Sequence, residues 1–178
     1  SWANTKLTAA YLPNFSYGMS KVANCNEKWL CIVDGGYLNN LPLVPLLAAH
    51  EEPFDLIIML DNRRERDHRL RTVKEAFQAS GQAGHDLAQL DDEAICLDTF
   101  TYAPAAHAGQ TGVIYMTLEP DSSFDPEFDA STDTTYATPN LFYTPEAAEK
   151  LAAFTEHVVI SNKSIITGAI ASSPTKTA

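Results

Sequence analysis

A single run, residues 29–47, constrains the fold most because it places an acidic turn between an apolar strand and an apolar helix. Residues 29–33 are apolar and partly β-branched, which is typical of a strand buried on both faces. The strand pattern ends at Asp34, and Gly35 and Gly36 follow, where a positive φ permits a sharp turn. We therefore expect Asp34 at the carboxyl end of a strand, which is where open α/β sheets bind ligands.

The second half of the run predicts a helix over residues 41–49. Asn39 or Asn40 can cap this helix, because an asparagine side chain accepts hydrogen bonds from the first free N–H groups. Pro42 falls in the first turn, where the N–H that proline lacks has no helical partner. The run as a whole therefore predicts a strand, an acidic turn and a helix.

The same run resembles the acidic motif of the patatin and cytosolic phospholipase A2 superfamily. The matching residues are Asp34, Gly35, Gly36, Asn39, Asn40, Leu41 and Pro42. Residues 54–61, an apolar segment that ends at Asp61, look like the segment that follows the motif in the lysophospholipase branch. The resemblance implies an α/β fold with a mixed, mainly parallel central sheet flanked by helices. It also implies that residues 1–178 form a single domain or the C-terminal half of one patatin-like catalytic domain.

In the family that this chain resembles, a serine on a nucleophile elbow attacks an acyl ester, and the aspartate of the acidic motif acts as its base. Asp34 matches that aspartate, with Gly35, Gly36, Asn39 and Asn40 as supporting motif residues. The nearest approach to an elbow is the segment 18–22, which lacks the second glycine and a preceding apolar strand. The resemblance thus implies a phospholipase or lysophospholipase whose Ser-Asp dyad takes only its aspartate from this chain. The serine would lie on a missing N-terminal half, and the isolated chain would be inactive.

Two alternatives remain open. Asp34 can be an ordinary turn or capping residue, because an Asp-Gly-Gly tripeptide is common in turns. The chain can also be a non-catalytic α/β module that binds partners through an acidic loop or an apolar groove. A serine elbow encoded upstream of this chain would favour the hydrolase.

Composition limits the partners. The formal net charge of −11 disfavours nucleic acid, whose phosphates would be repelled, and it disfavours broad electrostatic docking on anionic lipid. The resemblance implies a phospholipid or lysophospholipid substrate, and the net charge leads us to expect only peripheral contact with a membrane surface. No apolar run approaches the length of a membrane span, so we expect a soluble chain and favour the cytoplasm. The three cysteines show no zinc-ligand spacing, and we expect no metal and no cofactor.

The remaining sequence predicts alternating strands and helices. Strands are expected over residues 29–33, 56–60, 94–97 and 113–118, the first two adjacent and parallel through a right-handed crossover. Helices are expected over residues 69–80, from Thr144 onward, and in a last segment that contains Ile165 and Ile170. Residues 1–24 are expected to be loop with one short strand.

Three polar features need an interpretation. The charged run 62–69 is expected to be a solvated loop or helix start, with contact to a phosphate head group as the alternative. Residues 119–140 are expected to be an acidic surface loop or a partly mobile lid, and their aspartates lack the glycine and glutamate of an EF-hand. The five histidines are expected to be surface or loop residues, because no elbow serine is present for a triad.

Overall fold

A parallel pair of strands organises the larger part of the fold. In the computed structural model, β3 (Leu56–Asp61) pairs in parallel with β5 (Gly112–Thr117), with Ile57 opposite Val113. These apolar strands confirm the expectations for residues 56–60 and 113–118. The structure describes residues 10–19, 26–32, 41–48, 54–63, 65–137, 140 and 142–172, and the chain forms two compact units, Ser1–Asn40 and Leu41–Ala178.

The sheet of the second unit is mixed rather than mainly parallel. β4 (Phe100–Ala103) runs antiparallel to β5, so the strand order is β3-β5-β4, with one parallel and one antiparallel pair among the described strands of this sheet. β4 was not expected from the sequence. The mixed α/β class is confirmed at this level.

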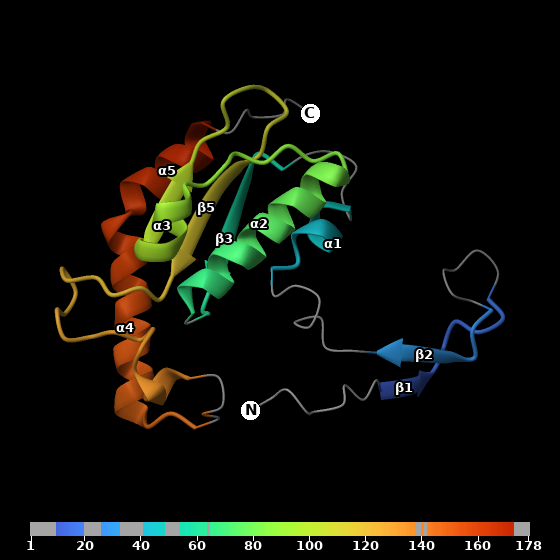
Figure 1. The fold of residues 1–178 in the computed structure, drawn as a ribbon, viewed down its shortest axis with the longest axis horizontal. Helices are drawn as coiled ribbons and strands as arrows, with labels where there is room; N and C mark the ends of the chain where they lie inside the picture. Colours follow the sequence, from blue (N-terminus) through green and yellow to red (C-terminus); the bar gives the residue numbers. More distant parts are fainter. Residues whose placement is uncertain are drawn as a thin grey trace. The chain divides into compact units, whose positions relative to one another are not determined.

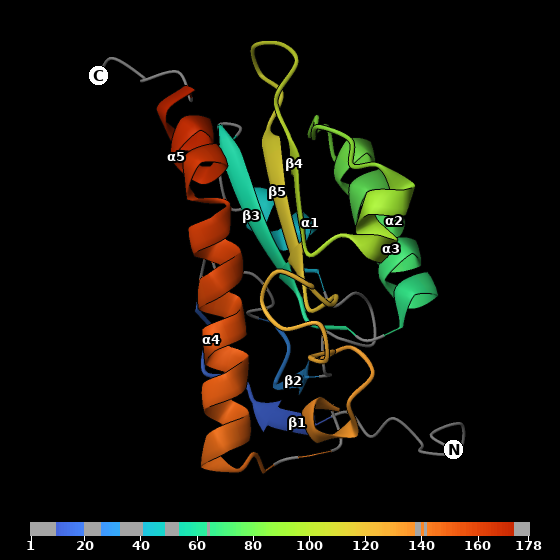
Figure 2. The ribbon, with the colours of Figure 1, turned by 90° about the vertical axis from the view of Figure 1, so that its left-hand side faces the viewer.

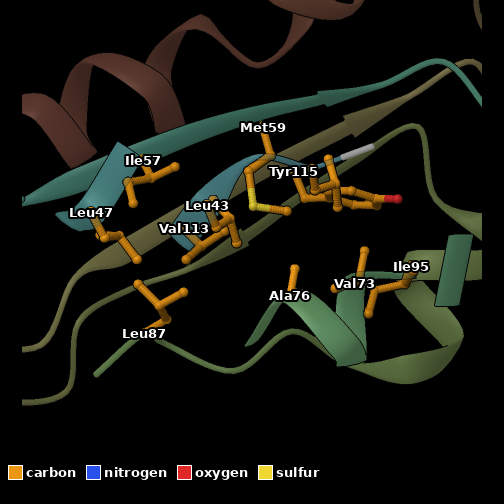
Figure 3. Packing of buried hydrophobic residues seen from close by; sticks show 11 residues of the cluster. Leu43, Leu47, Ile57, Met59, Val73, Ala76, Leu87, Ile95, Val113 and Tyr115 are labelled. Atoms are coloured by element: carbon orange, nitrogen blue, oxygen red, sulfur yellow. The ribbon is translucent and has the colours of Figure 1, made fainter. Parts of the chain in front are cut away.

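Three helices cover one face of this sheet. They are α1 (Leu43–Ala48), α2 (Arg66–Gln82) and α3 (Asp92–Leu97). Alternate residues of β3 and β5 point toward them, as the strand period of two requires, and Figure 3 shows these side chains meeting those of α1 and α2. The buried members of this first core are Leu41, Leu43, Leu47, Ile57, Met59, Val73, Ala76, Leu87, Ile95, Val113 and Tyr115.

The opposite face is covered by the C-terminal helices. Figure 2 shows α4 (Pro145–Ser161), continued by α5 (Lys163–Ser172), on the side of the sheet away from α2 and α3, and Figure 1 shows the same elements from another side. A second core joins α4 to Met116 of β5, to Phe100 of β4 and to the segment that follows β5. Its buried members are Leu118, Phe128, Ala130, Phe154 and Val158.

Local capping explains where the helices begin. Thr144 caps α4 as expected, since its Oγ1 accepts the N–H of Ala147 at 3.2 Å and proline occupies the first position. The strand expected over residues 94–97 is wrong, because these residues belong to α3. Asp91 begins that helix by accepting the N–H groups of Glu93 and Ala94 at 2.9 and 3.1 Å. A strong acidic N-cap outweighs the short apolar pattern there.

The first unit contains an antiparallel pair, β1 (Ala10–Pro13) and β2 (Trp29–Ile32). The expected strand at residues 29–33 is therefore present over residues 29–32. The expectation that it lies parallel and adjacent to β3 is wrong, because β2 and β3 belong to different sheets. The burial expected of this strand is not found at Trp29, which is 59 % exposed. An apolar strand pattern does not select the partner strand, and β1 takes that position.

Among the described residues, no helix combines the length and the apolar character that crossing a bilayer requires.

Candidate functional site

The predicted carboxylate site falls in a part of the chain that the structure does not describe. Asp34, Gly35, Gly36, Asn39 and Asn40 all lie outside the described residues. The elements on both sides of them are described: β2 ends at Ile32 and α1 begins at Leu43. The expected strand and helix that flank the acidic turn are thus confirmed, while the geometry of the turn itself stays a prediction.

A second carboxylate lies at the carboxyl end of β3. Asp61 is buried, and its two oxygens are both engaged. Oδ1 accepts hydrogen bonds from the backbone N–H of Arg63 at 3.1 Å and from its Nε at 2.8 Å. Oδ2 accepts the hydroxyl of Tyr115 at 2.7 Å and also pairs with Nη2 of Arg63.

These contacts fix the charge of Asp61. Burial raises the pKa of its carboxyl group, but the hydrogen bonds from Arg63 and Tyr115 outweigh burial and hold that pKa below its usual value. Burial and the neighbouring Asp61 charge raise the pKa of Tyr115 in turn. Asp61 is therefore an ionised carboxylate with its oxygens occupied, which suits a structural acceptor better than a general base.

Glu119, two residues after the end of β5, binds two more arginines. The side chains of Arg66 and Arg69, three residues apart on α2, both reach its carboxylate. Arg66 donates from Nη2 to Oε2 at 2.6 Å, and Nη2 of Arg69 pairs with Oε1. Arg69 and Glu119 are fully buried, so this is an internal ion pair.

Arg69 also links the segment after β3 to α3. Its Nη1 donates to the carbonyl of Arg63 and its Nη2 to the carbonyl of Cys96, both at 2.9 Å, while its Nε is buried without a hydrogen-bond partner. Arginines in the first turn of a helix are unfavourable to the helix dipole, and Glu119 offsets this. The expectation of a solvated run is therefore wrong for Arg69. Three arginines of this run, Arg63, Arg66 and Arg69, pair with carboxylates of the chain itself. These ion pairs do not favour the alternative that the run binds a phosphate head group.

The acidic segment after β5 is built from repeated turns. Asp121, Asp125, Asp129 and Asp133 each accept, through Oδ1, the backbone N–H two residues ahead, at 2.8 to 3.0 Å. Such local bonds are the reason that aspartate favours turns. The four-residue spacing that suggests cation ligands thus caps four successive turns. Among the residues that the structure describes, no group of His, Cys, Asp or Glu side chains is arranged to hold a metal ion.

Aromatic side chains attach this acidic segment to α4. Phe124 and Phe128 lie edge to face at 5.5 Å between ring centroids, and Phe154 of α4 contacts both at 5.4 and 5.1 Å. Phe128 and Ala130 are buried. Glu119, the first residue of the expected surface loop, is fully buried, and aromatic residues pack the described part of the segment against α4.

A serine, a histidine and an aspartate also meet at α4. Nε2 of His157 lies 3.0 Å from Oγ of Ser123 and 3.3 Å from Oδ2 of Asp121. A catalytic triad requires the carboxylate on the other ring nitrogen, whereas here both partners share Nε2 and Ser123 is also 2.7 Å from Asp121. The cluster is therefore a docking contact between the acidic segment and α4.

A pocket of about 540 Å³ lies at the opposite end of the sheet from Asp61 and Glu119. It is lined by the starts of β3 and β5, by the loop 104–110 and by Ala169 and Ser172 of α5. His107 on this loop lies 3.3 Å from Asp86. Parallel strands present their carboxyl ends at the other edge of this sheet, which is the edge where open α/β sheets bind ligands, so this pocket is not at that edge.

The chain matches no protein-family model, no curated protein and no solved structure.

Proposed function

We propose that this chain is the aspartate-bearing part of a lipid acyl hydrolase of the phospholipase or lysophospholipase type, with a patatin-like fold. Asp34 is the base that accepts the proton of a serine nucleophile, and the serine is supplied by a segment outside residues 1–178. Gly35 and Gly36 give the turn room for substrate, while Asn39 and Asn40 hold the start of the helix. The reaction requires no cofactor.

One observation carries the proposal: the Asp-Gly-Gly run lies between a strand and a helix. β2 ends two residues before Asp34, and α1 begins three residues after Asn40. A carboxylate at a strand end, next to glycines, can be approached closely by a serine while backbone N–H groups keep it ionised. The helices on both faces of the mixed sheet are compatible with this scaffold.

The carboxylates whose contacts are described above are weaker candidates for the base. Asp61 and Glu119 are buried and saturated by arginines. Asp121, Asp125, Asp129 and Asp133 cap turns. A general base needs an oxygen within reach of the proton that it accepts, so Asp34 remains the residue to test.

The test is Asp34→Asn in the protein that contains both this chain and the serine-bearing segment. Asparagine keeps the shape and capping ability of the side chain but cannot accept the proton. Release of fatty acid from a phospholipid or lysophospholipid should therefore fall by about 10²- to 10⁴-fold, the range typical of general-base loss. The melting temperature should hardly change, because asparagine caps about as well as aspartate.

Asp67→Asn is the matched control, since Asp67 is an exposed carboxylate in the first turn of α2, and its turnover should match the wild type. A stable Asp34→Asn protein with undiminished turnover would remove Asp34 and leave the non-catalytic binding module as the better explanation. Residues 1–178 alone should be inert toward acyl esters. Ester turnover by this chain that disappears when one of its own serines is changed would also contradict the proposal.

A further inference from the structure

The first unit exposes an unusual number of large apolar side chains. Within its described part, six of them are at least half exposed: Tyr11, Leu12, Phe15, Tyr17, Met19 and Trp29. The register places Trp29 opposite Pro13, on the same face of the ribbon as Tyr11, and Leu12 on the other face. A two-stranded ribbon cannot cover its own faces and is marginal in water by itself. Contact with an apolar environment would therefore stabilise it.

A fixed turn presents two of these aromatic residues. Asn14 is buried, its Nδ2 donates to the carbonyl of Glu27 at 2.7 Å, and its Oδ1 accepts the backbone N–H of Ser16 at 3.0 Å. The bond to Glu27 fastens the turn to the segment just before β2. Phe15, 83 % exposed, and Tyr17 therefore project from an anchored turn rather than from a loose end.

The exposed residue types match a lipid–water interface. Tryptophan and tyrosine combine an apolar ring with a polar atom and are enriched where membranes meet water. Phenylalanine, leucine and methionine gain free energy when they enter the apolar layer below the head groups. Lys28 lies with Nζ 5.8 Å from the centre of the Tyr17 ring, which places a cation beside this aromatic group at head-group level.

The two units differ in formal charge. Residues 1–40 carry three lysines against Glu27 and Asp34, a formal charge of +1, which leaves −12 for residues 41–178 out of the total of −11. Phospholipid surfaces carry zwitterionic or negative head groups, and a strongly acidic surface is repelled by the negative ones. The unit that exposes the aromatic residues is thus also the unit that a phospholipid surface accepts electrostatically.

We propose that the first unit docks on a zwitterionic phospholipid surface by inserting Phe15, Tyr17 and Trp29 into its interfacial layer. The choice of lipid as the partner rests on the proposed function, because a phospholipid hydrolase must work at such a surface. The docking itself requires neither Asp34 nor a serine nucleophile. It can therefore be measured on this chain without catalysis.

Tryptophan fluorescence provides the test. The chain has two tryptophans, so Trp2→Phe leaves Trp29 as the only reporter. On mixing this variant with phosphatidylcholine vesicles, emission should shift to shorter wavelength, and brominated acyl chains should quench it. Vesicles of phosphatidylglycerol at low salt should bind more weakly, because the −12 of residues 41–178 is repelled.

Phe15→Ser and Tyr17→Ser, each made in the Trp2→Phe chain, should weaken binding to phosphatidylcholine by about tenfold, since each removes an inserted ring. Phe142→Ser is the matched control: Phe142 is 86 % exposed but lies in the second unit, and its removal should leave binding unchanged. Circular dichroism of each variant should equal that of the parent, because these rings are exposed and little packing is lost.

The docking proposal would be overturned if brominated lipid did not quench the emission of Trp29. It would also be overturned if Phe15→Ser and Phe142→Ser reduced the affinity for vesicles equally. Self-association by sedimentation that shifts the emission of Trp29 without lipid would overturn it as well, because a second copy would then be the partner. Vesicle binding by a protein whose Asp34→Asn variant keeps full turnover would refute the proposed function alone. An Asp34-dependent hydrolase that does not bind vesicles would refute the docking alone.

Discussion

Arg69 is the charged residue whose environment is most unlike that expected from its sequence neighbours. It is fully buried, and its charge is balanced by Glu119. Glu119→Gln keeps the shape of the side chain but removes the balancing charge, so we expect a loss of about 3 kcal/mol or more in the free energy of unfolding. Urea denaturation measures this loss directly.

Asp92→Asn is the comparison for this variant, because Asp92 pairs with Lys74 at the surface, where both side chains are more than half exposed. That change should cost less than about 1 kcal/mol. The double variant Arg69→Met with Glu119→Leu should recover most of the stability that Glu119→Gln loses, because no unpaired charge is then buried. Equal losses in the free energy of unfolding for Glu119→Gln and Asp92→Asn would show that the buried pair contributes no more to stability than the surface pair.

Sequence reasoning missed this pair for a physical reason. A run of mixed charges is usually solvated, and composition alone does not show which arginine of the run faces the core. Two signals were present: Arg66 and Arg69 stand three residues apart on a helix, and Glu119 follows a largely apolar strand. Neither signal identifies the partner, since residues 69 and 119 meet only after β3 and β5 have paired.

At the scale of elements, the acidic segment should respond to pH. Hydrogen bonds from Ser123 lower the pKa of Asp121, and the side chain of Lys150 lowers that of Asp125. Burial raises the pKa of Asp129, yet the bonds from Ser131 and Thr132 outweigh it and the pKa falls below its usual value.

All three shifts have the same sign. A carboxylate whose pKa is lower in the folded than in the unfolded state stabilises the fold fully above the unfolded value of about 4. That stabilisation is lost as the pH falls through the folded pKa. We therefore expect the melting temperature to decline steeply below pH 4. Asp129→Asn keeps the oxygen that accepts the N–H of Ser131 but does not titrate, so it should flatten this decline; an identical decline would contradict the assignment.

The elements that could be predicted are those with a strong local signal. β3 and β5 follow from apolar, β-branched runs, and α4 follows from its threonine cap and proline. α3 could not be recognised from four apolar-looking residues, because its helix depends on the cap at Asp91. β4 was overlooked because its hydrogen bonds come from β5 and its own residues have no clear alternation.

At the scale of the whole molecule, the second unit should fold by itself. Among the residues that the structure describes, the members of both hydrophobic cores all come from Leu41 onward. A chain of residues 41–178 should therefore keep the cooperative unfolding transition of the longer chain, with a melting temperature within a few degrees of it. A fragment that shows no cooperative transition by circular dichroism would mean that residues 1–40 contribute to these cores.

Sequence also has a limit at this scale. The run around Asp34 predicts a strand and a helix correctly on its two sides, but the partner of that strand was predicted wrongly. Strand partners are chosen by contacts between distant segments, and a strand that is apolar on both faces fits more than one neighbour. The two elements that flank the acidic turn were therefore easier to predict than the sheet to which the strand belongs.

The central position of β5 has a consequence for how the second unit opens. β5 is hydrogen-bonded on both edges, by β3 and β4, and its side chains enter both cores, with Val113 and Tyr115 in one and Met116 against the other. No partial opening frees its amides while either core persists. The amide protons of β5 should thus be the slowest to exchange with deuterium, at a rate set by global unfolding, whereas those of the segment 121–135 exchange through local fluctuations.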